Sequence, residues 1–474
     1  MIEINNVLAS RYASVKMKHI WSQEGRTLFE REFWIAVMKA QKDLGIDISD
    51  SAIEDYERVK DNIDLNSIKH RESILRHDVK AKIEEFCALA GHEHIHKGLT
   101  SRDLTDNVEQ YQILKSLNLI KLKSGSALNL LAKKSQEFRS LVIAARTHNV
   151  AAQPTTLGKR FSMFGEEILK AFKTIDHLIE TYPLRGIKGA VGTLLDIKTL
   201  FNNDARKVET FQNKMAQYLG FNDLLNSVGQ VYPRSLDFEV ISTLCQVSAG
   251  ASSLCKTLRI MAGNELLSEG FQKGQVGSSA MPHKMNSRNC ERVNGFDVIL
   301  KGYLMMIGGL SGDQWNEGDV SCSVVRRVAL PDAFFAIDGL LETFMTILKE
   351  MTIFENMIEQ ETQRYLPFLI STTFLMEAVK KGAGREMCHE IIKKHSHQVM
   401  NDLKQRNITT NDLLTRLSDD QDFPLSNDDL TGILDTPDIY LGEALKQTDM
   451  FCAEVEALTK KYPEMLLVSP EALI

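Results

Sequence analysis

The chain has 474 residues, of which 43% are hydrophobic and 25% charged, a composition typical of a folded globular protein with two to four domains. The formal net charge of −7, with no dense run of Lys and Arg, argues against a nucleic-acid-binding protein. No apolar stretch has the length of a membrane span and the N-terminus lacks the apolar core of a signal peptide, so we expect a cytoplasmic protein.

Apolar residues recur at three- and four-residue spacing along most of the chain, which predicts an all-α protein. The pattern predicts one long helix from Asp103 to about Arg146 and a second from Leu236 to about Glu265, with Ser235 as its N-cap. A third helix is predicted from about Val328 to Phe354, with Pro331 in its first turn. Helices of this length are typical of an elongated bundle.

A polar segment at residues 91–105 and a shift in composition after Pro367 divide the chain into three predicted domains. These are an N-terminal helical domain of residues 1–103, a central long-helix bundle of residues 104–365 and a C-terminal helical domain of residues 366–474. The glycine-rich segment at residues 270–277 has the character of a mobile surface loop between helices.

The most informative segment is Gly277-Ser-Ser-Ala-Met-Pro-His-Lys-Met-Asn286, with Glu291 and Arg292 shortly after it. Two serines beside a glycine, a proline and a lysine can form a loop that closes over an anion. On composition alone, the plainer interpretation is a linker between helices with Lys284 in solvent. The order and spacing of the residues shift the balance towards a functional loop.

This string resembles the signature loop of the fumarase/aspartase superfamily, and within it the string is most similar to the adenylosuccinate lyase family. The segments Thr100-Ser-Arg-Asp103 and Arg146-Thr-His-Asn-Val-Ala-Ala-Gln-Pro154 resemble the superfamily's other two active-site segments, in the same order. Further likeness to adenylosuccinate lyases comes from Ser10-Arg-Tyr12, Arg76-His-Asp-Val79 and Val228-Gly-Gln-Val-Tyr-Pro-Arg234. The matching segments run from residue 10 to about residue 332.

The resemblance implies a β-elimination, in which a proton leaves the carbon beside a carboxylate, the C–N bond breaks and fumarate departs. Ser278 matches the family's base, and its hydroxyl would need activation by the positive potential of backbone amides and Lys284. His148 matches the general acid, a role that suits an imidazole titrating near neutral pH. Without the flanking match, a histidine hydrogen-bonded to backbone at a helix end would be an equally good interpretation of His148.

The family's substrate carries a phosphate and two carboxylates, so its site needs Arg, Lys and hydroxyl donors from several segments. The resemblance implies that Lys284 and Asn286 hold the succinyl carboxylates, with Glu291 as a supporting residue that orients Lys284 and His96 as a second supporting residue. The other substrate-binding residues that it implies are Arg11, Tyr12, Arg76, His77, Asp78, Thr100, Ser101, Gln230, Arg292, Ser323 and Arg327. Taken singly, each of these arginines would more often be a solvated charge or a salt-bridge partner.

Three histidines at alternate positions, His92, His94 and His96, have a spacing that is compatible with a metal site. No fourth ligand is evident, and the Thr-Ser pair beyond His96 accounts for this region as a substrate loop, so we do not expect a metal site here. The resemblance likewise implies a reaction that needs neither a metal nor another cofactor. A surface run of histidines is the plainer interpretation of His92 and His94. Seven scattered cysteines without a CxxC pair indicate neither a zinc site nor a disulfide framework.

One segment departs from the family pattern. In Glu317-Gly-Asp-Val-Ser-Cys-Ser323, Gly318 stands where the family has an arginine that contacts the substrate. The lost cation predicts weaker binding unless Arg326 or Arg234 compensates. The loop also reads Met285-Asn-Ser287 where relatives commonly have a basic residue and proline, and neither change removes the proposed acid or base.

The resemblance implies an all-α homotetramer, with active sites shared between subunits, that cleaves adenylosuccinate to AMP and fumarate and also cleaves the related succinyl-carboxamide ribonucleotide. Long apolar faces on an elongated helical domain need partners to cover them, whereas neither a nucleic acid nor a membrane is an expected partner. One alternative is another superfamily lyase such as argininosuccinate lyase, which the SRY, RHDV and GQVYPR segments argue against. The other is a non-catalytic structural protein on the same fold, which the retention of Ser278 and His148 argues against.

Overall fold

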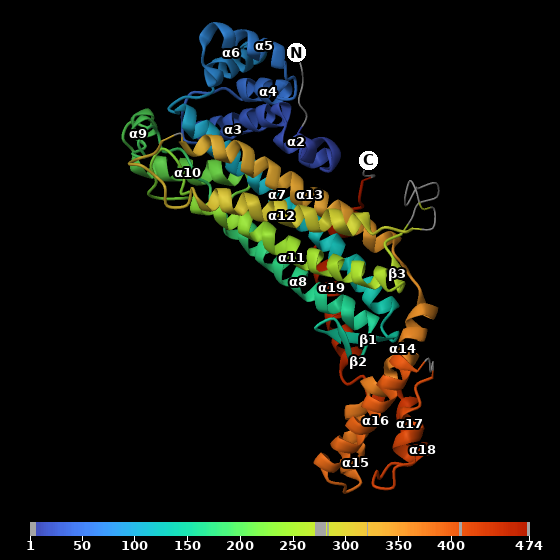
Figure 1. Ribbon diagram of the computed structural model, residues 1–474. Coiled ribbons are helices and arrows are strands. Elements are labelled where there is room, and N and C mark those ends of the chain that lie inside the picture. The colour runs from blue at the N-terminus through green and yellow to red at the C-terminus, as the bar shows by residue number, and fades with distance from the viewer. Residues whose placement is uncertain (1–5, 271–280, 282–283, 320, 407–409, 472–474) are drawn as a thin grey trace.

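The computed structural model describes residues 6–270, 281, 284–319, 321–406 and 410–471. Figure 1 shows an elongated molecule, with the N-terminal helices at one end, long helices in the middle and short C-terminal helices at the other end. The prediction of an all-α protein is confirmed: the described residues form long helices, with two small two-stranded sheets. Among these residues, no helix is both long and apolar enough to cross a bilayer.

The N-terminal end consists of six helices, each of which begins after a side chain that accepts a backbone N–H of the first turn. They are α1 (Val7–Arg11), α2 (Val15–Trp21), α3 (Gln23–Asp43), α4 (Asp50–Val59), α5 (Leu65–Leu75) and α6 (Asp78–Ala90). Their shared core contains Trp34, Tyr56 and Phe86, and the last two rings meet edge to face with centroids 4.8 Å apart.

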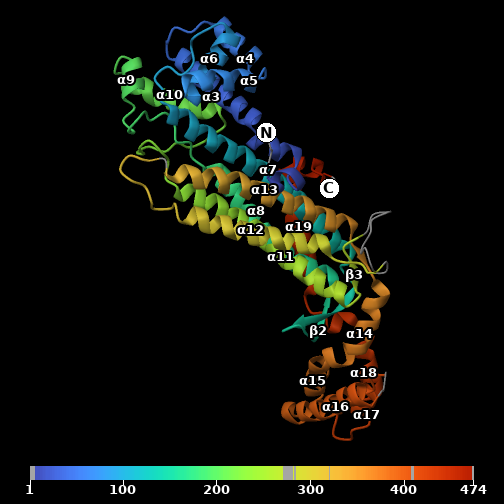
Figure 2. The same cartoon turned by 45° about the horizontal axis from the view of Figure 1, so that its top comes forward.

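Five long helices form the central bundle, and each packs against the next so that the set closes on itself in the order α7, α8, α11, α12, α13 and back to α7. Figure 2 shows them running side by side. Their bounds are α7 (Ser101–Glu137), α8 (Leu157–Thr181), α11 (Ser235–Gly263), α12 (Arg288–Gly308) and α13 (Ser321–Glu350). The short helices α9 (Leu195–Leu200) and α10 (Ala205–Tyr218) lie in the connection between α8 and α11.

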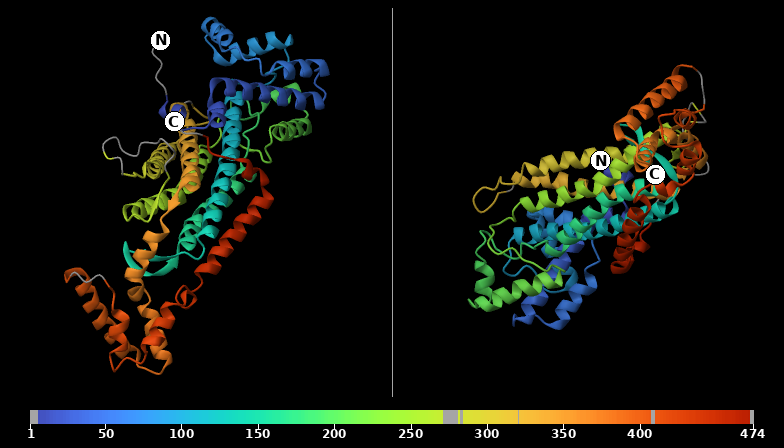
Figure 3. Two further views of the ribbon diagram at one scale, coloured as in Figure 1. Left: turned by 90° about the vertical axis from the view of Figure 1, so that its right-hand side faces the viewer. Right: turned by 90° about the horizontal axis from the view of Figure 1, so that it is seen from below.

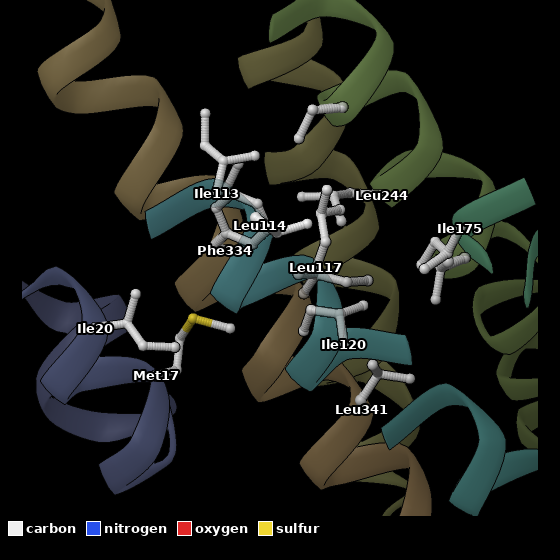
Figure 4. Close-up of a cluster of buried hydrophobic side chains, with 14 of the residues drawn as sticks. Met17, Ile20, Ile113, Leu114, Leu117, Ile120, Ile175, Leu244, Phe334 and Leu341 are labelled. Atoms are coloured by element: carbon white, nitrogen blue, oxygen red, sulfur yellow. The ribbon is translucent and has the colours of Figure 1, made fainter. Parts of the chain in front are cut away.

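The core of the bundle is centred on α7, which has buried residues around most of its circumference. Figure 4 shows Leu114, Leu117 and Ile120 of α7 between Phe334 of α13 and Leu244 of α11. All five side chains are at most 6% exposed. This burial stabilises a 37-residue helix with little amphipathic pattern of its own.

The first predicted long helix is too long, because α7 ends at Glu137. The chain then forms an antiparallel hairpin of β1 (Val142–Thr147) and β2 (Val150–Thr156). β-Branched residues in both strands favour this pairing over a continued helix.

The other two long helices also differ from the prediction at their N-terminal ends. Arg234, and not Ser235, is the N-cap of α11, so Ser235 is the first helical residue. The third helix, α13, begins at Ser321, and Pro331 therefore lies inside it and not in its first turn. A proline there removes one backbone hydrogen bond, which the packing of α13 against α7 and α12 offsets.

The C-terminal end has a second core, which includes Phe374, Cys388, Leu413 and Leu430. It is formed by α14 (Glu355–Leu369), α15 (Ser371–Lys380), α16 (Arg385–Gln405), α17 (Leu413–Ser418) and α18 (Asn427–Leu434). The chain then returns, as Figure 3 shows, and α19 (Ala444–Lys461) packs along α7 and α8 in the central bundle. The domain boundaries near residues 103 and 365 remain predictions.

Two short strands and two 3₁₀ turns complete the fold. The strands β3 (Leu267–Ser268) and β4 (Thr352–Ile353) pair beyond the ends of α11 and α13, and the 3₁₀ turns η1 (Pro437–Ile439) and η2 (Pro463–Leu467) flank α19.

Candidate active site

His148 lies at the exposed tip of the β1–β2 hairpin. It forms a two-residue turn with Asn149, and both residues have left-handed backbone angles, with φ of 53° and 61°. Two successive left-handed residues are the geometry of a type I′ turn, which suits an asparagine better than a histidine. His148 is exposed, so a ligand or another subunit can reach it.

The segment Thr100–Asp103 forms the N-terminus of α7, where Thr100 and Asp103 make a capping box. The fully buried Asp103 carboxylate also accepts hydrogen bonds from the Arg185 guanidinium at 2.8 Å and from the backbone N–H groups of Lys188 and Gly189 at 2.8 and 3.1 Å. One carboxylate therefore fixes both the helix start that carries Ser101 and the glycine-rich segment at residues 186–192.

The next turns of α7 extend this arrangement. Asp106 accepts hydrogen bonds from Arg102 at 3.1 Å, from Arg234 at 3.2 Å and from the backbone N–H of Tyr232 at 3.3 Å. Asp106 thus holds the segment at residues 228–234, which carries Gln230, against α7. We call Asp103, Asp106, Glu109, Arg185, Arg234 and Arg326 the α7 polar network.

Glu109 and Arg326 close the network on the side of α13. Arg326 donates to Glu109 at 2.6 Å and to Asp237 at 2.7 Å, and it also contacts the Tyr232 hydroxyl. Burial opposes ionisation of Glu109, but Arg326, Arg26 and Arg234 outweigh it and hold the pKa of Glu109 at about 2. Glu109 and Arg326 therefore remain charged at neutral pH.

Gln230 and Ser323 lie beside the start of α7. The Arg102 guanidinium donates to the Ser323 hydroxyl at 3.1 Å, and the backbone N–H of Gln230 donates to the Glu317 carbonyl at 2.7 Å. Gly318, next to Glu317, has φ of 140°, a conformation that side chains other than glycine rarely adopt. A backbone requirement thus accounts for the glycine at this position.

The two arginines named as compensating cations differ in their free donors. The Arg326 guanidinium is buried and donates to Asp237, Glu109 and Tyr232. Arg234 is also buried, but its Nε and Nη1 atoms have no acceptor among the described residues. Compensation by Arg234 therefore remains a prediction, and Arg326 is already committed to the network.

The segment Arg76–Asp78 lies at the junction of α5 and α6, on the same side of the molecule as the start of α7. Burial alone would lower the pKa of Arg26, but the charges of Glu109, Glu30 and Asp78 raise it overall. Asp78 therefore lies within electrostatic reach of this end of the bundle. Arg76 has a left-handed φ of 53°, and His77 caps α6 by accepting a hydrogen bond from the Lys80 N–H at 3.2 Å. The side chains of His77 and Asp78 are about half exposed, at 52% and 58%.

His92, His94 and His96 have separate partners and do not converge. His92 contacts Asp55 at 2.9 Å, His94 contacts Lys97 at 2.8 Å, and His96 accepts a hydrogen bond from the Trp34 indole at 3.1 Å. Burial, together with the nearby His77 and Lys80, lowers the pKa of His96 to about 4. His96 is therefore neutral at pH 7 and supports the segment that leads into Thr100.

Tyr12 and Arg292 lie further along the bundle. The Tyr12 ring packs edge to face on Phe296 with centroids 5.1 Å apart, and the Arg292 guanidinium carbon is 5.5 Å from the centre of the Tyr12 ring. Arg11 precedes this ring at the end of α1 and is exposed. Arg327 is exposed on α13, one residue beyond the buried Arg326.

Of the signature segment, Ser278 and the rest of residues 271–280 lie outside the described residues. Lys284 is exposed, and Asn286 lines a cavity of about 530 Å³ with Lys256, Arg259 and Glu291. Glu291 lies 3.6 Å from the Arg259 guanidinium, so the acid has a cationic partner on α11. The role of Glu291 in orienting Lys284 remains a prediction.

Within one chain, the candidate residues that the structure describes thus form separate groups. The start of α7 brings together Thr100, Ser101, Gln230 and Ser323, and the His148 turn lies at the other end of α7, next to α14 (Figure 1). The sequence analysis missed Asp103, Asp106, Asn107 and Gln110 as structural residues; the last two donate to the carbonyls of Gly186 and Pro183 at 2.9 and 2.8 Å. Their spacing of three, one and three residues places polar groups on one helical face where a core would be apolar, and that pattern was the available signal.

The architecture matches that of a solved lactonizing enzyme and a solved fumarate lyase. The 3-carboxy-cis,cis-muconate lactonizing enzyme of Pseudomonas putida has a TM-score of 0.79 at 18% identity, over 96% of this chain and 100% of that chain. A fumarate lyase of Mesorhizobium sp. BNC1 has a TM-score of 0.77 at 20% identity, over 94% of this chain and 98% of that chain. At these identities the likeness establishes the fold alone.

The sequence defines the class more closely. The family described as Lyase matches residues 11–299, and the family described as Adenylosuccinate lyase C-terminus matches residues 367–451. The adenylosuccinate lyase of Schistosoma mansoni is 32% identical over 100% of this chain and 99% of its own length, and that of Saccharomyces cerevisiae is 33% identical over 94% and 93%. The chain is therefore a lyase by family. In particular, it belongs to the adenylosuccinate lyase family.

Proposed function

We propose that this protein is a cytoplasmic adenylosuccinate lyase that releases fumarate from adenylosuccinate, leaving AMP, and from the succinyl-aminoimidazole-carboxamide ribonucleotide of purine biosynthesis. The observation that carries this proposal is full-length similarity to proteins named adenylosuccinate lyase, at up to 33% identity. Retention of the segments that carry Ser278 and His148 supports an active enzyme. The reaction as proposed needs no metal or other cofactor.

In the proposed mechanism, Ser278 removes the proton from the carbon beside a succinyl carboxylate, and Lys284 and Asn286 stabilise the negative charge that develops there. His148 protonates the nitrogen on the purine side as the C–N bond breaks. The exposure of the His148 turn supports this role, because the imidazole is free to meet a substrate that other elements hold.

We further propose that the active sites are shared in a homotetramer. The separation of the candidate residues supports this, because among the residues that the structure describes, neither the start of α7 nor the His148 turn brings the candidate residues together. An exposed apolar strip supports it as well: Val298 and Met305 on α12 are 68% and 78% exposed, and Val324 at the start of α13 is 72% exposed. A second subunit on this strip would bury these side chains.

The proposal is tested by offering the purified protein adenylosuccinate, with argininosuccinate in parallel, and measuring fumarate. We expect release from adenylosuccinate only, and we expect His148→Ala and Ser278→Ala each to lower turnover by at least about 100-fold without loss of assembly. Release from argininosuccinate alone would contradict the proposed substrate. Full activity in either variant would contradict the role of that residue.

Mixing the two inactive variants tests the shared sites. If one site takes Ser278 and His148 from different subunits, hybrid tetramers should regain part of the activity. Native mass spectrometry would establish that subunits exchange, and exchange without recovered activity would contradict the sharing of sites.

A further inference from the structure

We propose that the ion pair between Arg146 and Glu361 is a positioning device for His148, so that α14 sets the location of the acid and Glu361 is a positioning residue for the reaction. The inference rests on the proposed function, in which His148 is the general acid. It names a role for a residue of α14 outside the segments that resemble the family's active site.

The residues of the turn that carries His148 do not favour its backbone conformation. Two consecutive residues with left-handed backbone angles, one of them a histidine, cost free energy relative to a turn built with glycine. A register shift between Ala145 and Arg146 also interrupts the regular pairing two residues before the turn. Contacts from outside the hairpin are therefore needed to hold the imidazole in one place.

The base of the hairpin is attached to the body of the protein, whereas its tip is exposed. At the base, the Leu157 N–H donates to the Leu141 carbonyl at 2.9 Å, and the Arg160 guanidinium donates to the Ala144 carbonyl at 3.1 Å. At the tip, residues 147–150 are all exposed. The position of His148 thus depends on what holds the strand just before it.

Arg146 is the attachment nearest the turn; further back, the Thr362 hydroxyl of α14 donates to the Val142 carbonyl at 3.4 Å, and Gln153 of β2 donates to the Thr372 hydroxyl of α15 at 3.2 Å. The Arg146 Nη2 atom lies 2.5 Å from Glu361 Oε1, its guanidinium lies 5.8 Å from the centre of the Tyr365 ring, and its Nη1 atom is 3.4 Å from the Asn149 carbonyl. One side chain therefore connects α14 with both sides of the turn. The Arg146 and Glu361 side chains are only 23% and 13% exposed, so the pair is better shielded from water than a surface salt bridge.

Glu361 also compensates a second cation. Burial lowers the pKa of Arg160 to about 10, Glu361 acts against this shift, and Arg146 acts with it. The carboxylate therefore lies within electrostatic reach of two guanidinium groups that repel each other. Loss of Glu361 would leave both uncompensated beside the hairpin, and the strand that carries Arg146 would move away from α14.

The proposal predicts a loss in turnover without a matching loss in substrate binding. Glu361 belongs to α14, and the residues predicted to bind the substrate belong to other segments. A displaced general acid slows the chemical step, and misplacement by about 1 Å can cost about 100-fold. We therefore expect Glu361→Ala to lower kcat by about 10- to 100-fold with KM within about twofold of the parent value.

The matched control is Asp449→Ala. The Arg139–Asp449 pair also joins the connection between α7 and α8 to another helix, with both hydrogen bonds at 2.6 Å, but it lies at the base of the hairpin and not at its tip. We expect Asp449→Ala to leave kcat within twofold of the parent. Glu361→Gln, which keeps an acceptor for Arg146, should lose less activity than Glu361→Ala, and the double variant Arg146→Ala/Glu361→Ala should lose much less than the product of the two single losses.

Hydrogen exchange measured by mass spectrometry on the intact protein provides a readout that does not depend on activity. We expect Glu361→Ala to increase exchange at residues 145–152 and Asp449→Ala to leave it unchanged. An active parent enzyme with unchanged kcat in Glu361→Ala would overturn the inference. If the parent released no fumarate, the proposed function would fail by itself; faster exchange in Glu361→Ala would then still support the anchoring of the turn, and unchanged exchange would overturn it.

Discussion

The two ends of α7 hold candidate active-site residues by different means. At its N-terminal end, the α7 polar network fixes three chain segments through buried charges, including Asp103 and Arg185, which are both 0% exposed. At the other end, His148 lies on an exposed turn whose nearest attachment to α14 is a partly shielded ion pair. The contrast indicates a rigid platform at one end, which we propose binds the substrate, and a lightly held element at the other, which we propose supplies the acid.

The difference has a physical cause in what each end must do. Buried charges are costly unless each is paired and hydrogen-bonded, and a network that meets this condition has one stable geometry. Such a geometry suits groups that recognise a phosphate or a carboxylate. A turn at a surface needs fewer contacts and can meet a site on a second subunit.

The largest effect is expected from removing the central carboxylate of the platform. Asp103→Ala would leave Arg185 as a buried charge without its main acceptor, and it would leave the N–H groups of Lys188 and Gly189 unpaired. We expect the free energy of unfolding to fall by about 3–5 kcal/mol, measured by denaturant unfolding. An equally stable Asp103→Ala protein would contradict the rigid-platform interpretation.

The pH dependence of stability provides a second test at the same end. His96 has a pKa of about 4 in the folded protein, below the value of about 6.5 expected for an unfolded chain. Between these values the unfolded state binds a proton that the folded state does not, so the free energy of unfolding falls as the pH drops from about 6.5 to 4, by roughly 3 kcal/mol. His96→Gln keeps an acceptor for Trp34 and should remove this part of the pH dependence; the same slope in the variant and the parent would show that His96 is not its source.

The long helices could be predicted from the sequence, but not all of their ends. Apolar spacing predicted α7, α11 and α13, because packing on the bundle follows the helical period. The same spacing continued past Glu137 and hid the β1–β2 hairpin, since Val142 and Ile143 fit either pattern. Pairing with a strand several residues later decided between them, and a local pattern does not contain that information.

The candidate site could be named from motifs but not assembled. Resemblance identified the segments of Thr100, His148 and Lys284, yet it did not predict that Asp103 and Asp106 hold other segments to α7. Those contacts join residues about 80 to 130 positions apart, so the geometry depends on tertiary packing. The separation of the His148 turn from the start of α7 likewise became apparent only in the fold.

The smallest effect is expected at Gly318, where the platform departs from the family pattern. Gly318 has φ of 140°, and a Cβ added there would lie 3.2 Å from a methyl group of Val231 and 3.4 Å from Gln230 Cβ. We expect Gly318→Ala to cost about 1–3 kcal/mol and, by displacing the Glu317 carbonyl that holds Gln230, to raise KM several-fold in the fumarate assay. Gly309→Ala is the matched control, because Gly309 lies at the start of the same connection with φ of −66° and should tolerate alanine.

Gly318→Arg would restore the side chain that the family has at this position. This variant therefore compares two effects on substrate binding, the backbone strain at residue 318 and the return of the missing positive charge. The strain that affects alanine applies equally to arginine, so we expect KM to rise in this variant as well. A lower KM would show that the missing positive charge outweighs the backbone requirement. In that case the segment at residues 317–319 would have to be a less rigid part of the platform than the buried charges beneath it.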